Sequence, residues 1–286
     1  MRRFIRSLIF VPGNNPRFLE KAKTLPADIV CFDLEDSVPD SEKKNARKLI
    51  KGALKERSQY TSDVYVRINS PESTKIQDDL QEIVQKGLDG IVIPKVNNSK
   101  ELIKIEKTLA LLEKKRKLPS ISLIPSIESA EGVTKTYEIA SASKRISALI
   151  FGVFDLLNDM GIEYTKQPEG AKYAREKIPL EARAAGVYAL DAIWQDLEDQ
   201  NGLIEDCKIG KSLGYVGKTI IHPNQITITH QAFHPNKTEM EWAHKVCQTY
   251  EKSKKQGKGA TTVEGKMIDE VHYKRAKALL EFLINS

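Results

Sequence analysis

The sequence is poor in cysteine and has no long apolar run. Its three cysteines, Cys31, Cys207 and Cys247, lie far apart and form no CxxC pair, so they supply neither a disulfide framework nor a zinc site. No window approaches the roughly 20 apolar residues of a membrane span. The apolar run near the basic amino terminus covers about five residues, fewer than a secretory signal requires. We therefore expect a soluble cytoplasmic protein with no membrane partner.

Motifs of several large enzyme and binding classes are also missing. There is no GxGxxG, no P-loop, no Ser–His–Asp order and no zinc-finger spacing. Lysine and arginine outnumber the acids by 45 to 39, a net charge of +6 that could favour an anionic partner. We favour a lysine-rich solvated surface instead. Basic residues are not interleaved with aromatic ones as in single-strand binders, so we expect no nucleic-acid partner.

The sequence does contain short, continuously apolar runs, which are typical of buried parallel strands. Eight such runs alternate with amphipathic segments, one of which has Ser99 as a candidate N-cap. The runs cover residues 7–12, 28–35, 64–69, 90–96, 122–128, 148–155, 186–193 and 218–223. Eight strand–helix units in about 230 residues predict a (β/α)8 barrel. A doubly wound sheet is the alternative, but it would need a glycine fingerprint after an early strand.

The pattern changes after the eighth run. Residues 236–286 are typical of a helix, a Lys/Gly-rich segment, a turn and a last helix. We therefore predict a barrel domain over residues 1–235 and a C-terminal extension over residues 236–286.

Charged residues stand at or near the ends of six of the predicted strands. They are Asp33, Glu35 and Asp36 at the end of the second run, Arg67 in the third, Lys95 in the fourth, Glu128 in the fifth, Asp155 in the sixth and His222 in the eighth. The carboxyl ends of barrel strands converge on one mouth. Charges of both signs at so many ends predict a functional site there.

Glu128 and Asp155 are the two residues of this set best suited to a divalent cation. Magnesium prefers one or two carboxylates, with water and substrate oxygens completing its shell. No His/Cys cluster argues for zinc or iron. The alternative for either acid is an ion pair with Arg67 or Lys95 inside the mouth.

The other charged residues each allow two interpretations. Arg67 is suited to gripping a carboxylate or carbonyl with two hydrogen bonds. Asp33, Glu35 and Asp36 are too many negative charges to coexist without a cation or shifted pKa values, so they either approach the metal through water or orient the nearby cations. Asp36 could instead cap a helix. His222 could act as a base, but we favour a histidine hydrogen-bonded to backbone.

These motifs resemble the citrate lyase beta subunit family of the HpcH/HpaI aldolase/citrate lyase superfamily, which includes malyl-CoA and citramalyl-CoA lyases. In family order they are RSLIFVPGNNP, FDLEDSV, VRIN, GLDGIVIPKV, IPSIESAEGV, IFGVFDL, IIHPNQI and EGKMID. The resemblance implies a (β/α)8 barrel with a C-terminal helical lid, assembled as trimers or as hexamers. It implies Mg²⁺-dependent cleavage of malyl-, citramalyl- or citryl-CoA to acetyl-CoA and a 2-keto acid. A citrate lyase beta chain acting on citryl-acyl-carrier protein within a larger complex is the alternative.

The resemblance also implies roles for single residues. Glu128 and Asp155 match the magnesium ligands, with Glu128 also touching substrate, and Arg67 matches the arginine that binds the keto acid. Two further acids, Glu35 and Asp36, match residues that hydrogen-bond around the metal.

Outside the barrel, Asp269 in GKMID looks like the lid aspartate that a neighbouring subunit contributes as catalytic acid/base. The loop PGNNP matches the segment that meets coenzyme A, and Lys21 and Lys23 are candidates for its phosphates. One departure is Phe154, which stands where many relatives have an acid directly before the metal-binding aspartate; it leaves the choice of substrate open.

Overall fold

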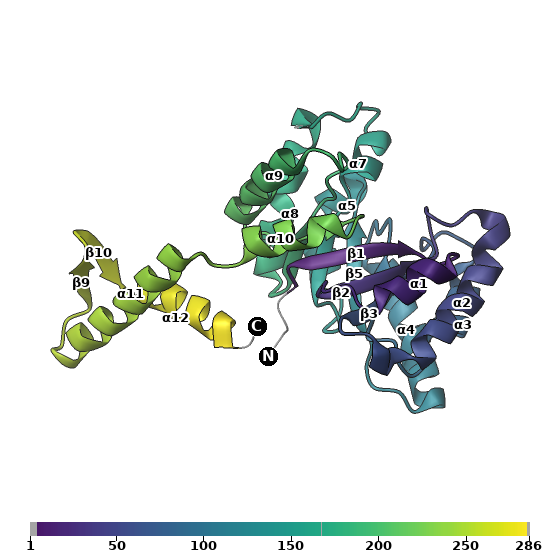
Figure 1. Cartoon of the computed structure of the whole chain (residues 1–286), viewed down its shortest axis with the longest axis horizontal. Helices are drawn as coiled ribbons and strands as arrows, with labels where there is room; N and C mark the ends of the chain where they lie inside the picture. Colours follow the sequence, from purple (N-terminus) through teal and green to yellow (C-terminus); the bar gives the residue numbers. More distant parts are fainter. Residues whose placement is uncertain (1–4, 167, 285–286) are drawn as a thin grey trace. The chain divides into compact units, whose positions relative to one another are not determined.

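The computed structural model describes residues 5–166 and 168–284. Its larger compact unit, Ile5–Phe233, is a closed barrel of eight strands in chain order (Figure 1). The strands are β1 Ser7–Pro12, β2 Ile29–Asp33, β3 Asp63–Arg67, β4 Gly90–Ile93, β5 Ser122–Ile127, β6 Ala148–Phe151, β7 Tyr188–Asp191 and β8 Gly217–Ile220. All neighbours pair in parallel, and β8 returns to β1 with Thr219 opposite Leu8. The predicted (β/α)8 barrel is confirmed.

Helices follow the strands and cover the outside of the barrel. They are α1 Pro16–Ala22, α2 Lys43–Lys55, α3 Ile76–Ile83, α4 Ser99–Arg116, α5 Ala130–Thr134, α6 Thr136–Ser141, α7 Val153–Asp159, α8 Lys172–Ala184, α9 Gln200–Leu213 and α10 Asn224–Phe233, with short 3-10 turns η1 Asp40–Glu42, η2 Arg57–Gln59 and η3 Glu169–Ala171. In α2, for example, Ala46, Ile50 and Leu54 recur every four residues and are buried against the sheet side. No helix among the described residues is long and apolar enough to cross a membrane.

The start of α4 corrects one prediction. Asn98, not Ser99, is the N-cap: its extended backbone places the side-chain oxygen to accept from the N–H groups of Lys100 and Glu101. Ser99 is the first helical residue, and its hydroxyl donates to Glu138 instead.

Alternation along the strands separates two apolar layers. One set of positions, including Leu8, Cys31, Val92 and Leu190, forms a small cluster inside the barrel. The intervening positions pack outward in a larger cluster that includes residues of the covering helices. Because side chains alternate with a period of two, continuing the inner rows toward the strand ends leads to the polar residues at the mouth.

The second compact unit contains the chain from His234 onward. It holds α11 Lys237–Lys255, a hairpin of β9 Ala260–Val263 and β10 Lys266–Asp269, and α12 Glu270–Ile284. Asn236 caps α11 with a capping box. The hairpin was predicted only as a turn; Glu264 and Gly265 both have positive φ, as a tight two-residue connection requires.

Candidate active site

A cavity of about 500 Å³ lies at the carboxyl ends of the barrel strands. Its polar lining comes from strand ends and from the loops that follow, namely Asp33, Asp36, Ser37, Arg67, Ser126, Glu128, Asp155 and Thr219. Its apolar lining includes Phe10, Ile150, Phe151, Val153, Phe154, Ile193 and Ile221. The predicted convergence of charged residues on one mouth therefore occurs in the structure.

Arg67 is held rigidly at the floor of this mouth. Its Nε and Nη2 atoms each donate to one oxygen of Asp33, both at 2.7 Å, and its guanidinium lies 4.6 Å from the centre of the Phe10 ring. The Ser37 hydroxyl and backbone N–H also donate to Asp33. Burial would raise the pKa of Asp33, but Arg67 outweighs it and holds the value at about 2. Asp33 thus fixes the position of Arg67.

The third nitrogen of Arg67, Nη1, forms ion pairs but no hydrogen bond with the nearby acids. Its Nη1 atom lies 3.2 Å from Glu35 Oε2 and 3.8 Å from an Asp36 oxygen, without a hydrogen bond to either. This nitrogen can therefore donate to a substrate oxygen while Asp33 keeps the guanidinium in place. Asp36 caps none of the described helices; it pairs with Lys95 at 3.1 Å and so helps to orient that ammonium.

Lys95 joins four carboxylates of the mouth. Its backbone N–H donates to Glu128 Oε1 at 2.5 Å, and its ammonium lies 2.7 Å from Glu35, 3.1 Å from Asp36 and 3.5 Å from Asp155. The ion pair that we considered as an alternative for Asp155 is therefore present.

Negative charge exceeds positive charge among these described residues. The five carboxylates named above face only Arg67 and Lys95, and the buried Glu35 Oε2 atom accepts no hydrogen bond from a described residue. Burial raises the pKa of Glu35 to about 7, while burial and the neighbouring Asp155 and Glu35 carboxylates raise that of Glu128 to about 8. The Glu35 oxygen without a hydrogen bond and the raised pKa values of Glu35 and Glu128 indicate that a cation fits here.

The donors suit a hard ion. Glu128 and Asp155 supply two carboxylates, the number that magnesium accepts when water and substrate fill the remaining positions. No group of three or more His, Cys, Asp or Glu with metal-binding geometry occurs among the described residues, so nothing there favours an ion that needs a full protein cage.

Gly152 gives Glu128 its space, and this residue was missed from the sequence. It is the N-cap of α7, with Asp155 in the first turn, and its N–H donates to the carbonyl of Ile127. A Cβ at position 152 would overlap the side chain of Glu128. The next residue but one, Phe154, stacks on Tyr164 with ring centres 4.5 Å apart, so the departure from the family pattern adds an aromatic wall to the mouth.

Other predicted residues lie elsewhere or have local roles. Asp269 belongs to the second unit, where it caps α12 by accepting from the N–H groups of Val271 and His272; its carboxylate also lies 2.7 Å from His272 Nδ1. His222 Nδ1 accepts from the Asn224 N–H, as the favoured interpretation held.

Lys21 and Lys23 are not at the mouth. They end α1, and the Lys23 carbonyl accepts from Thr61, which precedes β3, so both lie at the amino-terminal face of the barrel. The Lys23 ammonium is paired with Glu20 and Glu56. Our suggestion that they contact coenzyme A phosphates was wrong, because a helix that follows a strand runs back from the mouth.

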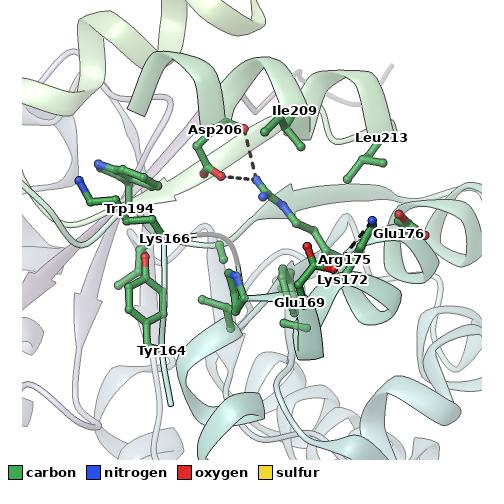
Figure 2. A pocket seen from close by; sticks show the side chains of 16 residues that line it. Tyr164, Lys166, Glu169, Lys172, Arg175, Glu176, Trp194, Asp206, Ile209 and Leu213 are labelled. Carbon is green, nitrogen blue, oxygen red and sulfur yellow. Dashed lines mark hydrogen bonds and ion pairs between the residues drawn. The ribbon is translucent and has the colours of Figure 1, made fainter. Parts of the chain in front are cut away.

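A second cavity of about 220 Å³ lies between α8, α9 and the loops after β6 and β7 (Figure 2). Arg175 and Asp206 of its lining belong to a balanced group of charges that also includes Asp191 and Lys218. Asp206 lies 2.8 Å from Arg175 and 2.5 Å from Lys218, and Asp191 lies 2.5 Å and 3.2 Å from the same two cations. Because each buried charge there already has its partners, the chemistry is better placed at the mouth.

Comparison with known proteins identifies the family of the chain. Residues 6–223 match the family HpcH/HpaI aldolase/citrate lyase, and the chain belongs to that family. It is 34% identical to the citrate lyase subunit beta of Escherichia coli K12 over 279 residues, covering 96% of this chain and 92% of that protein. It is 33% identical to a (3S)-malyl-CoA thioesterase of Cereibacter sphaeroides, with 96% and 93% covered.

Two further similarities extend the range of relatives. The mitochondrial citramalyl-CoA lyase of Rattus norvegicus is 30% identical, with 96% of this chain and 85% of that one covered. The crystal structure of CitE from Mycobacterium tuberculosis with magnesium, acetoacetate and coenzyme A has a TM-score of 0.80 and 26% identity, and 99% of each chain is covered. The resemblance drawn from the motifs is confirmed, and with it the prediction of an enzyme of the citrate lyase beta subunit-like kind.

Proposed function

We propose that this protein is a Mg²⁺-dependent carbon–carbon lyase that cleaves malyl-, citramalyl- or citryl-CoA to acetyl-CoA and a 2-keto acid. The observation that carries the proposal is the excess of carboxylates at the mouth, with Glu128 and Asp155 beside a rigidly held Arg67. The M. tuberculosis relative with magnesium, acetoacetate and coenzyme A, and the lyases among the other relatives, support it.

Each charged residue of the mouth has its own role in the proposed reaction. Glu128 and Asp155 would hold Mg²⁺, which when bound supplies a Lewis acid to the substrate hydroxyl and carboxylate. Arg67 Nη1 donates to the oxygen that becomes the keto group, where negative charge develops. Glu35 and Asp36 keep Lys95 and Arg67 oriented toward the cavity.

Cleavage also needs one proton to move. The 3-hydroxyl loses its proton, the C2–C3 bond breaks, and its electron pair passes into a thioester enolate that takes up a proton to become acetyl-CoA. We assign this proton to Asp269. The Asp269 carboxylate would accept the proton from the hydroxyl and return it to the enolate. The hydrogen bond from His272 lowers the pKa of Asp269 and so keeps this carboxylate ionised before substrate binds.

Asp269 would reach the mouth as part of a lid, residues 236–286, contributed by a neighbouring subunit of a homotrimer or hexamer in the cytoplasm. The alternative function is a citrate lyase beta subunit acting on citryl-acyl-carrier protein in a larger complex, which the 34% identity to the E. coli subunit favours. The similarity to a malyl-CoA thioesterase adds hydrolysis of the product as a possible second step.

A coupled assay tests the proposal. Purified protein is incubated with each of the three thioesters, with Mg²⁺ or with EDTA, while the keto acid, acetyl-CoA and free CoA are measured. We expect metal-dependent formation of acetyl-CoA and one matching keto acid, a loss of about 10³-fold in Glu128→Ala, and normal activity in Glu131→Ala, an exposed acid on α5. Folded protein that cleaves none of the three, but turns over citryl-acyl-carrier protein with added partners, would establish the alternative.

A further inference from the structure

Lys95 is held in the mouth by an uncommon backbone conformation. Its φ of +52° is in the left-handed region, which non-glycine residues enter rarely and keep only where the surroundings impose it. This conformation lets one residue present two groups to the same site: its N–H contacts Glu128, and its ammonium contacts Glu35, Asp36 and Asp155.

The three ammonium contacts are unequal. Glu35 at 2.7 Å and Asp36 at 3.1 Å accept hydrogen bonds, whereas Asp155 at 3.5 Å forms only an ion pair. Asp155 is also one of the two acids suited to the metal. The Lys95 ammonium and the expected cation therefore share the Asp155 carboxylate, and this is the weakest of the three contacts that the ammonium makes.

Two cations that share a carboxylate in a partly buried site repel each other strongly, because the local dielectric is far below that of water. We propose that the Lys95 ammonium is the counter-ion of the metal-free mouth and competes with the divalent cation for Asp155, so that Lys95 limits the affinity for metal. This rests on the proposed function, which assigns the metal to Glu128 and Asp155.

The competition has a reciprocal consequence. Lys95 lowers the affinity of Asp155 for the metal, and bound metal weakens the Lys95–Asp155 ion pair by the same free energy, because coupling between two bound groups is mutual. Binding of the metal shifts the ammonium toward Glu35 and Asp36, which retain it in the mouth. Lys95 is thus a positioning residue that balances the charge of the acids when metal leaves.

The left-handed backbone supplies a sharp test. Lys95→Gly removes the ammonium but keeps the N–H that donates to Glu128, and glycine adopts this φ freely. Mg²⁺ binding to metal-free protein is measured by titration calorimetry at about pH 9, where Glu35 and Glu128 are ionised. We expect Lys95→Gly to bind Mg²⁺ about tenfold or more tightly than the unsubstituted protein.

A matched control is available at Lys117, which has a φ of +55° and is exposed at the end of α4. Lys117→Gly makes the same exchange in the same conformation and should leave Mg²⁺ affinity unchanged. Lys95→Asn is a second neutral variant that tolerates the left-handed region. Structural damage at Lys95 would weaken binding, so tighter binding in both variants supports competition.

The outcomes separate the two levels of the argument. If the unsubstituted protein binds Mg²⁺, Asp155→Asn loses it, and Lys95→Gly binds equally or more weakly, the competition is overturned and the metal site stands. If only the Lys95 variants bind measurably, competition is supported in its strongest form. If neither the protein nor the Lys95 variants bind Mg²⁺, both the metal assignment and the inference are wrong.

Discussion

Glu128→Gln is expected to stabilise the metal-free protein while it abolishes catalysis. Glu128 is buried beside Asp155 and Glu35, and these conditions raise its pKa from 4.5 to about 8. An ionised Glu128 is therefore unfavourable in the folded state. Glutamine has the same shape, carries no charge, and its amide oxygen can still accept the hydrogen bond from the Lys95 N–H.

The sign and the size of the effect follow from this shift. Because the folded pKa lies above the unfolded one, the folded protein binds the extra proton between about pH 4.5 and pH 8, so its stability falls as pH rises through that window and then levels off. The shift sets a ceiling of about 5 kcal/mol. Relaxation and water entry reduce it, and we expect about 2 kcal/mol for Glu128→Gln at about pH 8.5.

Thermal unfolding in EDTA measures the prediction. For a barrel of this size about 2 kcal/mol raises Tm by about 4–8 °C. Near pH 5 the two proteins should unfold together, since the Glu128 carboxyl is then protonated in the fold. Mg²⁺ should raise the Tm of the unsubstituted protein alone. The exposed Glu72→Gln serves as control, with a change of less than about 0.5 kcal/mol. An equal Tm at pH 8.5, or the same gain at both pH values, would refute the reasoning.

Two other substitutions test the barrel around the site. Gly152→Ala should push the Glu128 side chain aside and weaken Mg²⁺ binding by about tenfold or more. The control Gly52→Ala has open space around its Cβ, so it should bind Mg²⁺ normally, and its free energy of unfolding should rise by about 0.5–1 kcal/mol because alanine favours the helix. Normal Mg²⁺ binding by Gly152→Ala would contradict this prediction. Lys218→Ala should lower the free energy of unfolding by about 3–5 kcal/mol, because it removes a fully buried cation from two aspartates. Lys75→Ala loses only an exposed ion pair and should lower it by less than about 1 kcal/mol. Equal losses in thermal unfolding would show that burial does not determine the effect.

The strand starts were predictable to within two residues, whereas several strand ends were not. The apolar runs extend past β2, β3 and β4 because Leu34, Ile68 and Val96, which follow those strands, are fully buried too. Hydropathy records burial and not hydrogen bonding, so it cannot mark where a ladder stops. The same limit hid the β9–β10 hairpin, in which half of the strand residues are exposed and there is little apolar alternation.

The gathering of charged residues at the mouth was predictable, because parallel strands in a closed barrel end on one face. Their pairing was not. Three features depend on backbone geometry that no residue pattern encodes. Asp33 accepts hydrogen bonds from Arg67 with both oxygens, Gly152 leaves space for Glu128, and Lys95 has a left-handed backbone. Asp269 came from family resemblance alone, since its local contacts are those of an ordinary helix cap.

The choice between a metal and an ion pair for Asp155 could not be made from the sequence, and the structure explains why. The observed pair with Lys95 leaves a second acid, Glu128, buried without a cation of its own and with a raised pKa. An ion pair that completed the site would have left no such residue. If the proposed metal site is correct, the two interpretations describe the same carboxylate at two stages: Lys95 pairs with Asp155 when metal is absent, and the remaining negative charge attracts the metal.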